Sequence, residues 1–128
     1  MKKSDNNVVS LFEQTNQGVQ KAVLTDSMKM KRGGSLSNPI VAYETWGKLS
    51  KQKDNVIVIL TGLSASSHVA SHSNNSKPGW WEGIVGPDKA IDTNKFYVIC
   101  VNSLGSCFGS TGPASVSYTH LTLPTSSV

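Results

Sequence analysis

Two short glycine-containing loops hold the residues of this sequence whose types and spacing come closest to a reactive site. Residues 62–66 read GLSAS and residues 105–109 read GSCFG. Both approach the G-x-S-x-G pattern, which exposes a nucleophilic serine on a sharp strand-to-helix turn. The first loop ends in Ser66 instead of glycine, and the second has Cys107 at its centre. A thiol nucleophile at Cys107 and a merely structural Cys107 therefore both stay open at this point.

A nucleophile of this kind needs a histidine base, and the chain offers His68 and His72 close to the first loop. Neither follows a plausible nucleophile, although in this arrangement the base comes after the serine in the chain. A role on the loop surface is the simpler interpretation, and His68 could in addition touch a ligand. Glu82 and Asp92 have no evident carboxylate partner, so we expect them to cap or turn the chain. No cysteine–histidine spacing suggests zinc, and we expect no metal.

The elements that must position these loops are strands. Val56–Leu60 is an uninterrupted apolar run rich in β-branched residues, and residues 96–102 (FYVICVN) indicate a second strand of the same kind. Such runs are typical of parallel strands buried on both faces, and about 35 residues between them suffice for a crossover. Ile40–Trp46 predicts a strand antiparallel to them, and residues 22–30 an edge strand beside it. The pattern predicts an α/β fold with a mostly parallel sheet and an antiparallel N-terminal edge.

Composition narrows the class of protein. The 128 residues carry a net charge of +4 and are 38% hydrophobic, as in an ordinary globular domain. No apolar run reaches the ~20 residues of a membrane span, and no signal peptide begins the chain. We expect a cytoplasmic protein that binds neither membrane nor nucleic acid. Cys100 lies in an apolar run, which predicts a buried thiol, and in that compartment we expect no disulfide to Cys107.

The chain divides into three parts. Residues 1–20 are polar and weakly patterned, which indicates a loose N-terminal arm, and residues 21–115 form the body of the domain. Residues 116–125 read VSYTHLTLPT, the translation of a transposon-type sequencing adapter. An alternating strand is the alternative interpretation. We treat residues 116–128 as a non-native tail and exclude them from functional reasoning.

Several longer motifs occur in order through the body of the chain. They are VAYETWG at 41–47, TGLS at 61–64 with His68 after it, KPGWWE at 77–82, GPDKAIDT at 86–93, NSLGSC at 102–107 and GSTGP at 109–113. Together they resemble the homoserine O-acetyltransferase family of α/β-hydrolase-fold acyltransferases, over residues 33–115. Many members have His-Ala where this chain has Thr61-Gly62. This variant and NSLGSC are similar to the serine O-succinyltransferase branch.

The resemblance implies a truncated N-terminal part of an α/β-hydrolase fold. The family transfers an acyl group from acyl-CoA to an amino-acid hydroxyl through a Ser acyl-enzyme, with acyl-CoA as co-substrate and no other cofactor. We expect L-homoserine as the acceptor, with the alternatives of serine succinylation, an esterase of the same fold, or an inactive fragment. The resemblance places residues 105–109 before the true elbow, so the Ser, Asp and His of the triad are expected beyond this chain. The full-length protein is expected to be a homodimer.

The resemblance implies that the chain retains half of an oxyanion hole. In this fold one N–H donor comes from the loop after the third strand, and the resemblance assigns it to the backbone N–H of Leu63. Without a Cβ, the neighbouring glycine lets the backbone approach a ligand; a plain strand-exit turn is the alternative. Trp80 and Trp81 could line an acyl channel or act as packing anchors. The predicted substrate-binding residues are Gly62, Leu63, Ser64 and Ala65.

Overall fold

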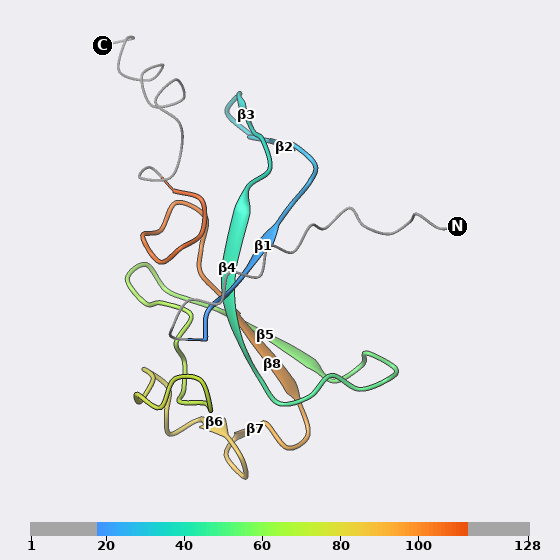
Figure 1. Ribbon diagram of the computed structural model, residues 1–128, viewed down its shortest axis with the longest axis vertical. Helices are drawn as coiled ribbons and strands as arrows, with labels where there is room; N and C mark the ends of the chain where they lie inside the picture. The colour runs from blue at the N-terminus through green and yellow to red at the C-terminus, as the bar shows by residue number, and fades with distance from the viewer. Residues whose placement is uncertain (1–17, 113–128) are drawn as a thin grey trace.

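The computed structural model describes residues 18–112 of the chain. Eight strands follow one another in this range (Figure 1), and no helix occurs among the described residues. Their bounds are β1 Gln20–Val23, β2 Met28–Lys29, β3 Ser35–Leu36, β4 Ile40–Trp46, β5 Val56–Leu60, β6 Val85–Gly86, β7 Ile91–Asp92 and β8 Tyr97–Val101. The expected division at residue 20 falls at the start of β1, and the predicted non-native tail at 116–128 lies outside the described residues.

Four strands form the main sheet, in the order β1-β4-β8-β5. β8 pairs in parallel with β5, so that Val56 lies opposite Tyr97 and Leu60 opposite Val101. β4 pairs antiparallel with β8 on its other side and antiparallel with β1 at the edge. The predicted parallel neighbours and the antiparallel N-terminal strands are thereby confirmed. The sheet is mixed, with one parallel pair and two antiparallel pairs.

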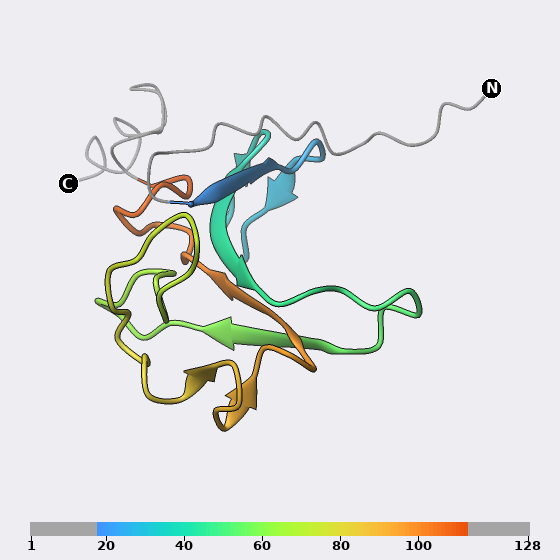
Figure 2. The same ribbon diagram turned by 60° about the horizontal axis from the view of Figure 1, so that its bottom comes forward.

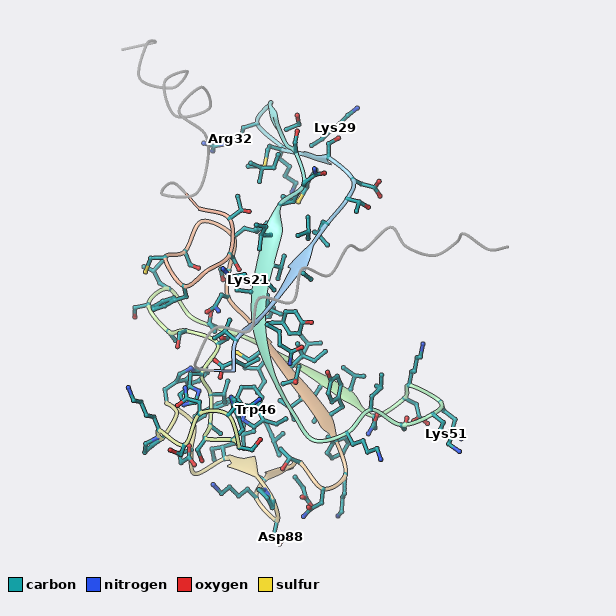
Figure 3. The ribbon with its side chains drawn as sticks, viewed as in Figure 1. Lys21, Lys29, Arg32, Trp46, Lys51 and Asp88 are labelled. Carbon is teal, nitrogen blue, oxygen red and sulfur yellow. The ribbon has the colours of Figure 1, made fainter. Side chains whose placement is uncertain are left out.

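The predicted edge strand over residues 22–30 is divided in two. β1 starts earlier, at Gln20, and stops at Val23, and β2 forms a separate hairpin with β3. Gly33 and Gly34, with φ of 99° and 82°, make the turn of this hairpin, since residues without a Cβ adopt positive φ without strain. Figure 3 places Lys29 and Arg32 on this hairpin and Lys51 on the turn between β4 and β5, at the other end of the structure.

Residues 61–96 connect β5 to β8 and cover one face of the sheet. The core lies between this connection and the sheet and consists of Trp46, Ile59, Val69, Ala70, Val85, Val98 and Cys100. The indole N–H of Trp46 donates to the carbonyl oxygen of Ala70 at 3.1 Å, which fastens the connection to β4. β6 and β7 form a short parallel pair within it. This connection contains no helix, like the rest of residues 18–112.

The expectation that β5 is buried on both faces was wrong. Val56, Val58 and Leu60 are 40%, 57% and 79% exposed, whereas Ile59 is buried. Strand side chains alternate between the two faces of a sheet, and nothing in residues 18–112 packs over the second face of β5. An apolar run therefore gave the strand correctly but could not show whether both of its faces are covered.

Candidate functional site

The loops after the two parallel strands lie at the same edge of the sheet. Figures 1 and 2 both show the loop after β5 and the loop after β8 on the same side of the molecule. In open α/β sheets, ligands bind at the carboxyl ends of the strands. A cavity of about 390 Å³ opens here between the two loops, lined by Val19, Lys21, Glu44, Ser66, Ser67, His68, Asn75, Asn102, Phe108 and Gly109.

Glu44 lies on the wall of this cavity and is only 1% exposed. Its carboxylate accepts three hydrogen bonds, all from the loop after β5. Ser67 Oγ donates to Oε2 at 2.8 Å, while His68 Nδ1 and His72 Nε2 lie 2.9 and 2.8 Å from Oε1. Among the described residues no lysine or arginine forms an ion pair with Glu44. Its buried carboxylate is therefore satisfied by hydrogen bonds from the two histidines and the Ser67 hydroxyl.

The hydrogen-bond partners fix the protonation of both rings. His68 Nε2 faces the carbonyl oxygen of Lys77 at 2.7 Å and must donate to it, so the ring can donate to Glu44 only as an imidazolium. His72 Nδ1 accepts the N–H of Asn74 at 3.2 Å, which leaves the proton on Nε2, facing Glu44. We therefore assign a positive charge to His68 and a neutral ring to His72.

The pKa of His68 agrees with this assignment. Burial alone would lower the pKa, but the hydrogen bonds to Glu44 and to the Lys77 carbonyl, with the charges of Glu44 and Glu82, outweigh it. The pKa of His68 is therefore raised above its ordinary value of 6.5. Glu44 also lies opposite Cys100 across the β4–β8 pair. Burial first, and then the Glu44 charge, raises the pKa of the Cys100 thiol to about 12, so this thiol stays protonated.

A second anchor of the same loop comes from the end of β8. Asn102 Oδ1 accepts the backbone N–H of Ser67 at 2.7 Å, and Asn102 Nδ2 donates to Ser67 Oγ at 2.9 Å. Asn102 itself is held because its N–H donates to the Ala42 carbonyl and its own carbonyl accepts the Ser110 hydroxyl. Ser67 is therefore tied to both β4 and β8.

The predicted substrate-binding residues lie between the end of β5 and this anchored serine. Gly62, Leu63 and Ser64 are exposed, Leu63 fully so, and Ala65 is partly buried. They lie next to the cavity without lining it, whereas Ser66, Ser67 and His68 line it directly. The space around Gly62 is open, since a Cβ there would meet no atom within 4 Å. The backbone of this stretch is thus accessible from solvent.

The sequence pattern did not single out Glu44, and it gave His68 and His72 no partner. A signal was present in the alternation of β4, which buries Ala42, Glu44 and Trp46 on one face. A carboxylate between two apolar residues of that period predicts a buried charge, which needs partners. What the sequence could not give was that the partners come from a loop more than twenty residues away.

Glu44, His68 and His72 are also the described residues whose ligand atoms converge enough to hold a metal ion, within 4.8 Å of one another. A ligating histidine must present an unprotonated nitrogen. Here the hydrogen bonds place protons on the two nitrogens that face Glu44. We therefore interpret the group as a hydrogen-bonded cluster, and the expectation of no metal stays a prediction.

Glu82 and Asp92 act as turn acceptors, as expected. Glu82 accepts from the Ser71 hydroxyl and from the backbone N–H groups of Ser71 and Gly79. The Ser71 hydroxyl and these two N–H groups lower the pKa of Glu82 to about 2. Asp92 accepts the N–H groups of Asp88 and Asn94 in the turn beside β7. Both carboxylates thus organise the connection between β5 and β8.

The aromatic pair and the second cysteine are only partly buried. Trp80 and Trp81 are each 42% exposed, with ring centroids 5.3 Å apart, and Trp80 Nε1 donates to the Ser66 carbonyl at 2.8 Å. They pack against the end of the anchored loop, so the packing alternative has direct support and the channel alternative stays a prediction. Cys100 is buried and Cys107 is exposed, and both are free thiols.

The sequence is similar to curated serine O-succinyltransferases. The chain is 62% identical over 93 residues to a serine O-succinyltransferase of Frateuria aurantia, covering 72% of this chain and 25% of the relative. It is 54% identical over 99 residues to a serine O-succinyltransferase of Xanthomonas campestris, covering 77% and 26%. No protein-family model matches the chain. The chain therefore spans about a quarter of the length of the curated relatives it matches.

Solved structures agree on the fold. A homoserine O-acetyltransferase from Bacillus anthracis matches with a TM-score of 0.60 and 38% identity, over 67% of this chain and 23% of that chain. Esterase E22 matches with a TM-score of 0.66 and 37% identity, over 80% and 30%. These neighbours are α/β-hydrolase-fold proteins, so the described sheet is part of an α/β-hydrolase fold.

The chain belongs to the homoserine O-acetyltransferase family of α/β-hydrolase-fold acyltransferases, as its motifs indicated. The two curated relatives named above are both serine O-succinyltransferases. Residues 18–112 contain no helix that could cross a membrane.

Proposed function

We propose that this chain supplies the oxyanion-hole loop and part of the substrate pocket of an acyl-CoA-dependent amino-acid O-acyltransferase. Serine is the proposed acceptor and succinyl-CoA the proposed donor. The observation that carries the choice is 62% identity over 93 residues to a serine O-succinyltransferase. This replaces L-homoserine as our preferred acceptor. Acyl-CoA enters as a co-substrate, and no other cofactor is proposed.

The role of this chain in the reaction is electrostatic. When a nucleophile attacks the thioester carbonyl of acyl-CoA, its oxygen becomes negative, and the backbone N–H of Leu63 donates to that oxygen. As the CoA thiolate leaves, the carbonyl re-forms in the acyl-enzyme. The hydroxyl of the acceptor serine then attacks this carbonyl, its oxygen becomes negative again, and the enzyme's nucleophile leaves. The same N–H therefore serves both half-reactions. Removing one oxyanion donor typically costs about 2.7–4 kcal/mol of transition-state stabilisation.

The structure supports this role in two ways. Residues 61–65 follow the carboxyl end of β5, which is the position from which this fold takes its second oxyanion donor. Within residues 18–112 the N–H of Leu63 donates to no backbone carbonyl, and its side chain projects into solvent. The cavity beside it is lined by Lys21, Ser66 and Asn75, whose polar groups suit a carboxylate-bearing ligand.

Activity is best tested in a chimera, because the chain spans a quarter of its relatives' length. The 93 aligned residues of this chain would replace those of the Frateuria aurantia enzyme. We expect CoA release with succinyl-CoA and serine, and at least tenfold less with acetyl-CoA or with homoserine, a discrimination within the range that one lost polar contact gives. Faster release with acetyl-CoA and homoserine would return the acceptor to the homoserine branch.

The 128-residue chain by itself should release no CoA above background, since neither GLSAS nor GSCFG has a serine at the centre of a Gly-x-Ser-x-Gly pattern. Release by this chain that survives Cys107→Ala would mean that the catalytic machinery is misassigned. Release that disappears with Cys107→Ala would support the exposed thiol as a nucleophile.

An esterase is the second candidate function, because esterase E22 matches the fold at 37% identity over 80% of this chain. Attack on an ester or on a thioester gives a tetrahedral intermediate with the same negatively charged oxygen, so the oxyanion loop does not discriminate between the two substrates. A chromogenic acetate ester, offered to the chimera without CoA, distinguishes an esterase from an acyltransferase. Hydrolysis faster than acyl transfer to serine would favour the esterase.

A further inference from the structure

The loop that bears Leu63 is fixed at both ends, and Gly62, Leu63 and Ser64 between them are exposed. Its start is the end of β5, which is paired with β8 up to Leu60 and Val101. Its other end is Ser67, which is 1% exposed and makes hydrogen bonds to Glu44 and Asn102. Residues 61–66 therefore span two fixed points, and Leu63 lies in the middle of that span.

Glu44 is the centre of the second fixed point. All three donors to its carboxylate belong to the loop after β5, and the two that lie nearest to Leu63 in the sequence are Ser67 and His68. His68 is in turn fixed by the Lys77 carbonyl, and the His68 N–H lies 3.3 Å from the Ser66 hydroxyl. One side chain on β4 thus helps to hold, together with Asn102, the end of the loop that follows Leu63.

Stability alone gives no reason for a carboxylate here. A buried ionic cluster can often be replaced by apolar residues of similar volume without loss of stability. β4 already buries Ala42 and Trp46 on this face, so an apolar residue would suit position 44 by pattern. What an apolar residue could not do is hold Ser67, His68 and His72 in one defined geometry.

We propose that Glu44 is a positioning residue for acyl transfer, acting through the backbone N–H of Leu63. The carboxylate holds Ser67 and His68, these residues hold the end of the loop, and the loop aims the N–H at the reacting oxygen. The inference rests on the proposed function. It adds a residue on β4 that touches neither the acyl group nor CoA and still determines the rate.

The test is a double-mutant cycle in the chimera, with kcat and KM measured for succinyl-CoA and serine. Glu44→Gln keeps the size of the side chain and removes an acceptor, and we expect kcat to fall by about 10- to 100-fold, as a displaced catalytic group does. KM for serine should change by less than about threefold, since the lost interaction forms only in the transition state.

Leu63→Pro removes the donor itself and should lower kcat by about 100- to 1,000-fold. In the Leu63→Pro background, Glu44→Gln should cost less than about threefold more, because the group it positions has gone. Leu63→Ala keeps the N–H and so measures the part of the loss that comes from the side chain. Thr45→Val lies on the same strand as Glu44 and removes a hydrogen bond that Gln20 of β1 donates, so it controls for a general effect on β4.

Ser67→Ala provides a milder disturbance in case Glu44→Gln impairs folding. It removes one donor to Glu44 and should lower kcat by about three- to tenfold, again without further loss in the Leu63→Pro background. Hydrogen exchange in the 128-residue chain reports the anchor directly. The Ser67 amide, bonded to Asn102, should exchange faster in Glu44→Gln and unchanged in Thr45→Val.

The outcomes separate the inference from the function on which it rests. Suppose that Leu63→Pro lowers kcat and that the fold-losses of Glu44→Gln and Leu63→Pro multiply in the double mutant. That result would overturn the positioning role alone. Full kcat in Glu44→Gln, with the Leu63→Pro loss intact, would do the same. A parent chimera without activity, or one indifferent to Leu63→Pro, would overturn the proposed function and the inference with it.

Discussion

The two faces of the main sheet differ in whether other parts of the chain cover them, although the strands that form the sheet are similar in sequence. On one face, Trp46, Val98 and Ile57 lie in one cross-strand row and Glu44, Cys100 and Ile59 in the next. The connection between β5 and β8 covers these rows. On the other face, Thr45, Ile99 and Val58 form a row that no described element covers. We call these the covered face and the bare face.

The difference teaches that composition identifies a strand but not its surroundings. β5 and β8 are both apolar, β-branched runs and look alike in the sequence. β8 lies between two strands and has Val98 and Cys100 fully buried, whereas β5 lies at the edge of the described sheet with Val58 and Leu60 exposed. The charged residue Glu44 is on the covered face, so polar character did not mark the outside either.

The largest effect should come from breaking the polar cluster of the covered face. Glu44→Ala leaves the His68 charge and the Ser67 hydroxyl without their acceptor. Removing one partner of a buried ion pair costs about 3–5 kcal/mol, and we expect a loss of that size in urea unfolding of the 128-residue chain. Thr45→Val, one residue away and facing the other side, should cost less than about 1 kcal/mol. Equal losses would mean that the cluster is not specially anchored.

Matched valines on the two faces should give the next largest difference. Val98→Ala removes two methyl groups from a fully buried side chain and should cost about 2 kcal/mol. Val58→Ala makes the same chemical change on a side chain that is 57% exposed and should stay within about 0.5 kcal/mol. The midpoints of urea unfolding would show the difference. A costly Val58→Ala would indicate that the bare face is covered in solution.

The bare face should also determine self-association. Val56, Val58 and Leu60 expose apolar surface along an edge strand, a combination that promotes aggregation, and we expect the 128-residue chain to be poorly soluble. Leu60→Lys should raise the concentration at which light scattering begins. Ser103→Lys adds the same charge at an exposed position off this strand and controls for net charge. A similar gain from both variants would assign the effect to charge alone.

The smallest effect concerns pH. Because the pKa of His68 is higher in the folded chain than its ordinary 6.5, its pair with Glu44 contributes fully below pH 6.5. That contribution is lost as the pH rises through the folded value. An NMR titration should place the His68 midpoint above 6.5, and Glu44→Gln should lower it. A midpoint below 6.5 would mean that burial outweighs the Glu44 hydrogen bond.

Much of the fold could be predicted from the sequence, because strand periodicity and turn residues are local signals. Val56–Leu60 and Ile40–Trp46 are strands with the predicted bounds, and the parallel partner of β5 was predicted one residue too long at each end. What could not be predicted was the bare face of β5. That depends on which other elements pack there, and the run itself holds no such information.

The candidate site was predicted only where a motif marks it. Residues 61–64 match the family motif and lie at the carboxyl end of β5, so their place was predictable, while their role stays a prediction. Glu44 and the two histidines were not brought together in advance, because their contacts join β4 to a distant loop. Long-range polar contacts of this kind depend on the path of the connection, which the local pattern does not contain.

The central claim is that the N–H of Leu63 stabilises the oxyanion of acyl transfer. The most direct measurement is the initial rate of CoA release from succinyl-CoA and serine by three forms of the chimera: the parent, Leu63→Ala and Leu63→Pro. We predict that Leu63→Ala keeps the parental rate within about threefold and that Leu63→Pro loses about 100-fold or more. Similar rates for Leu63→Pro and Leu63→Ala would contradict the claim.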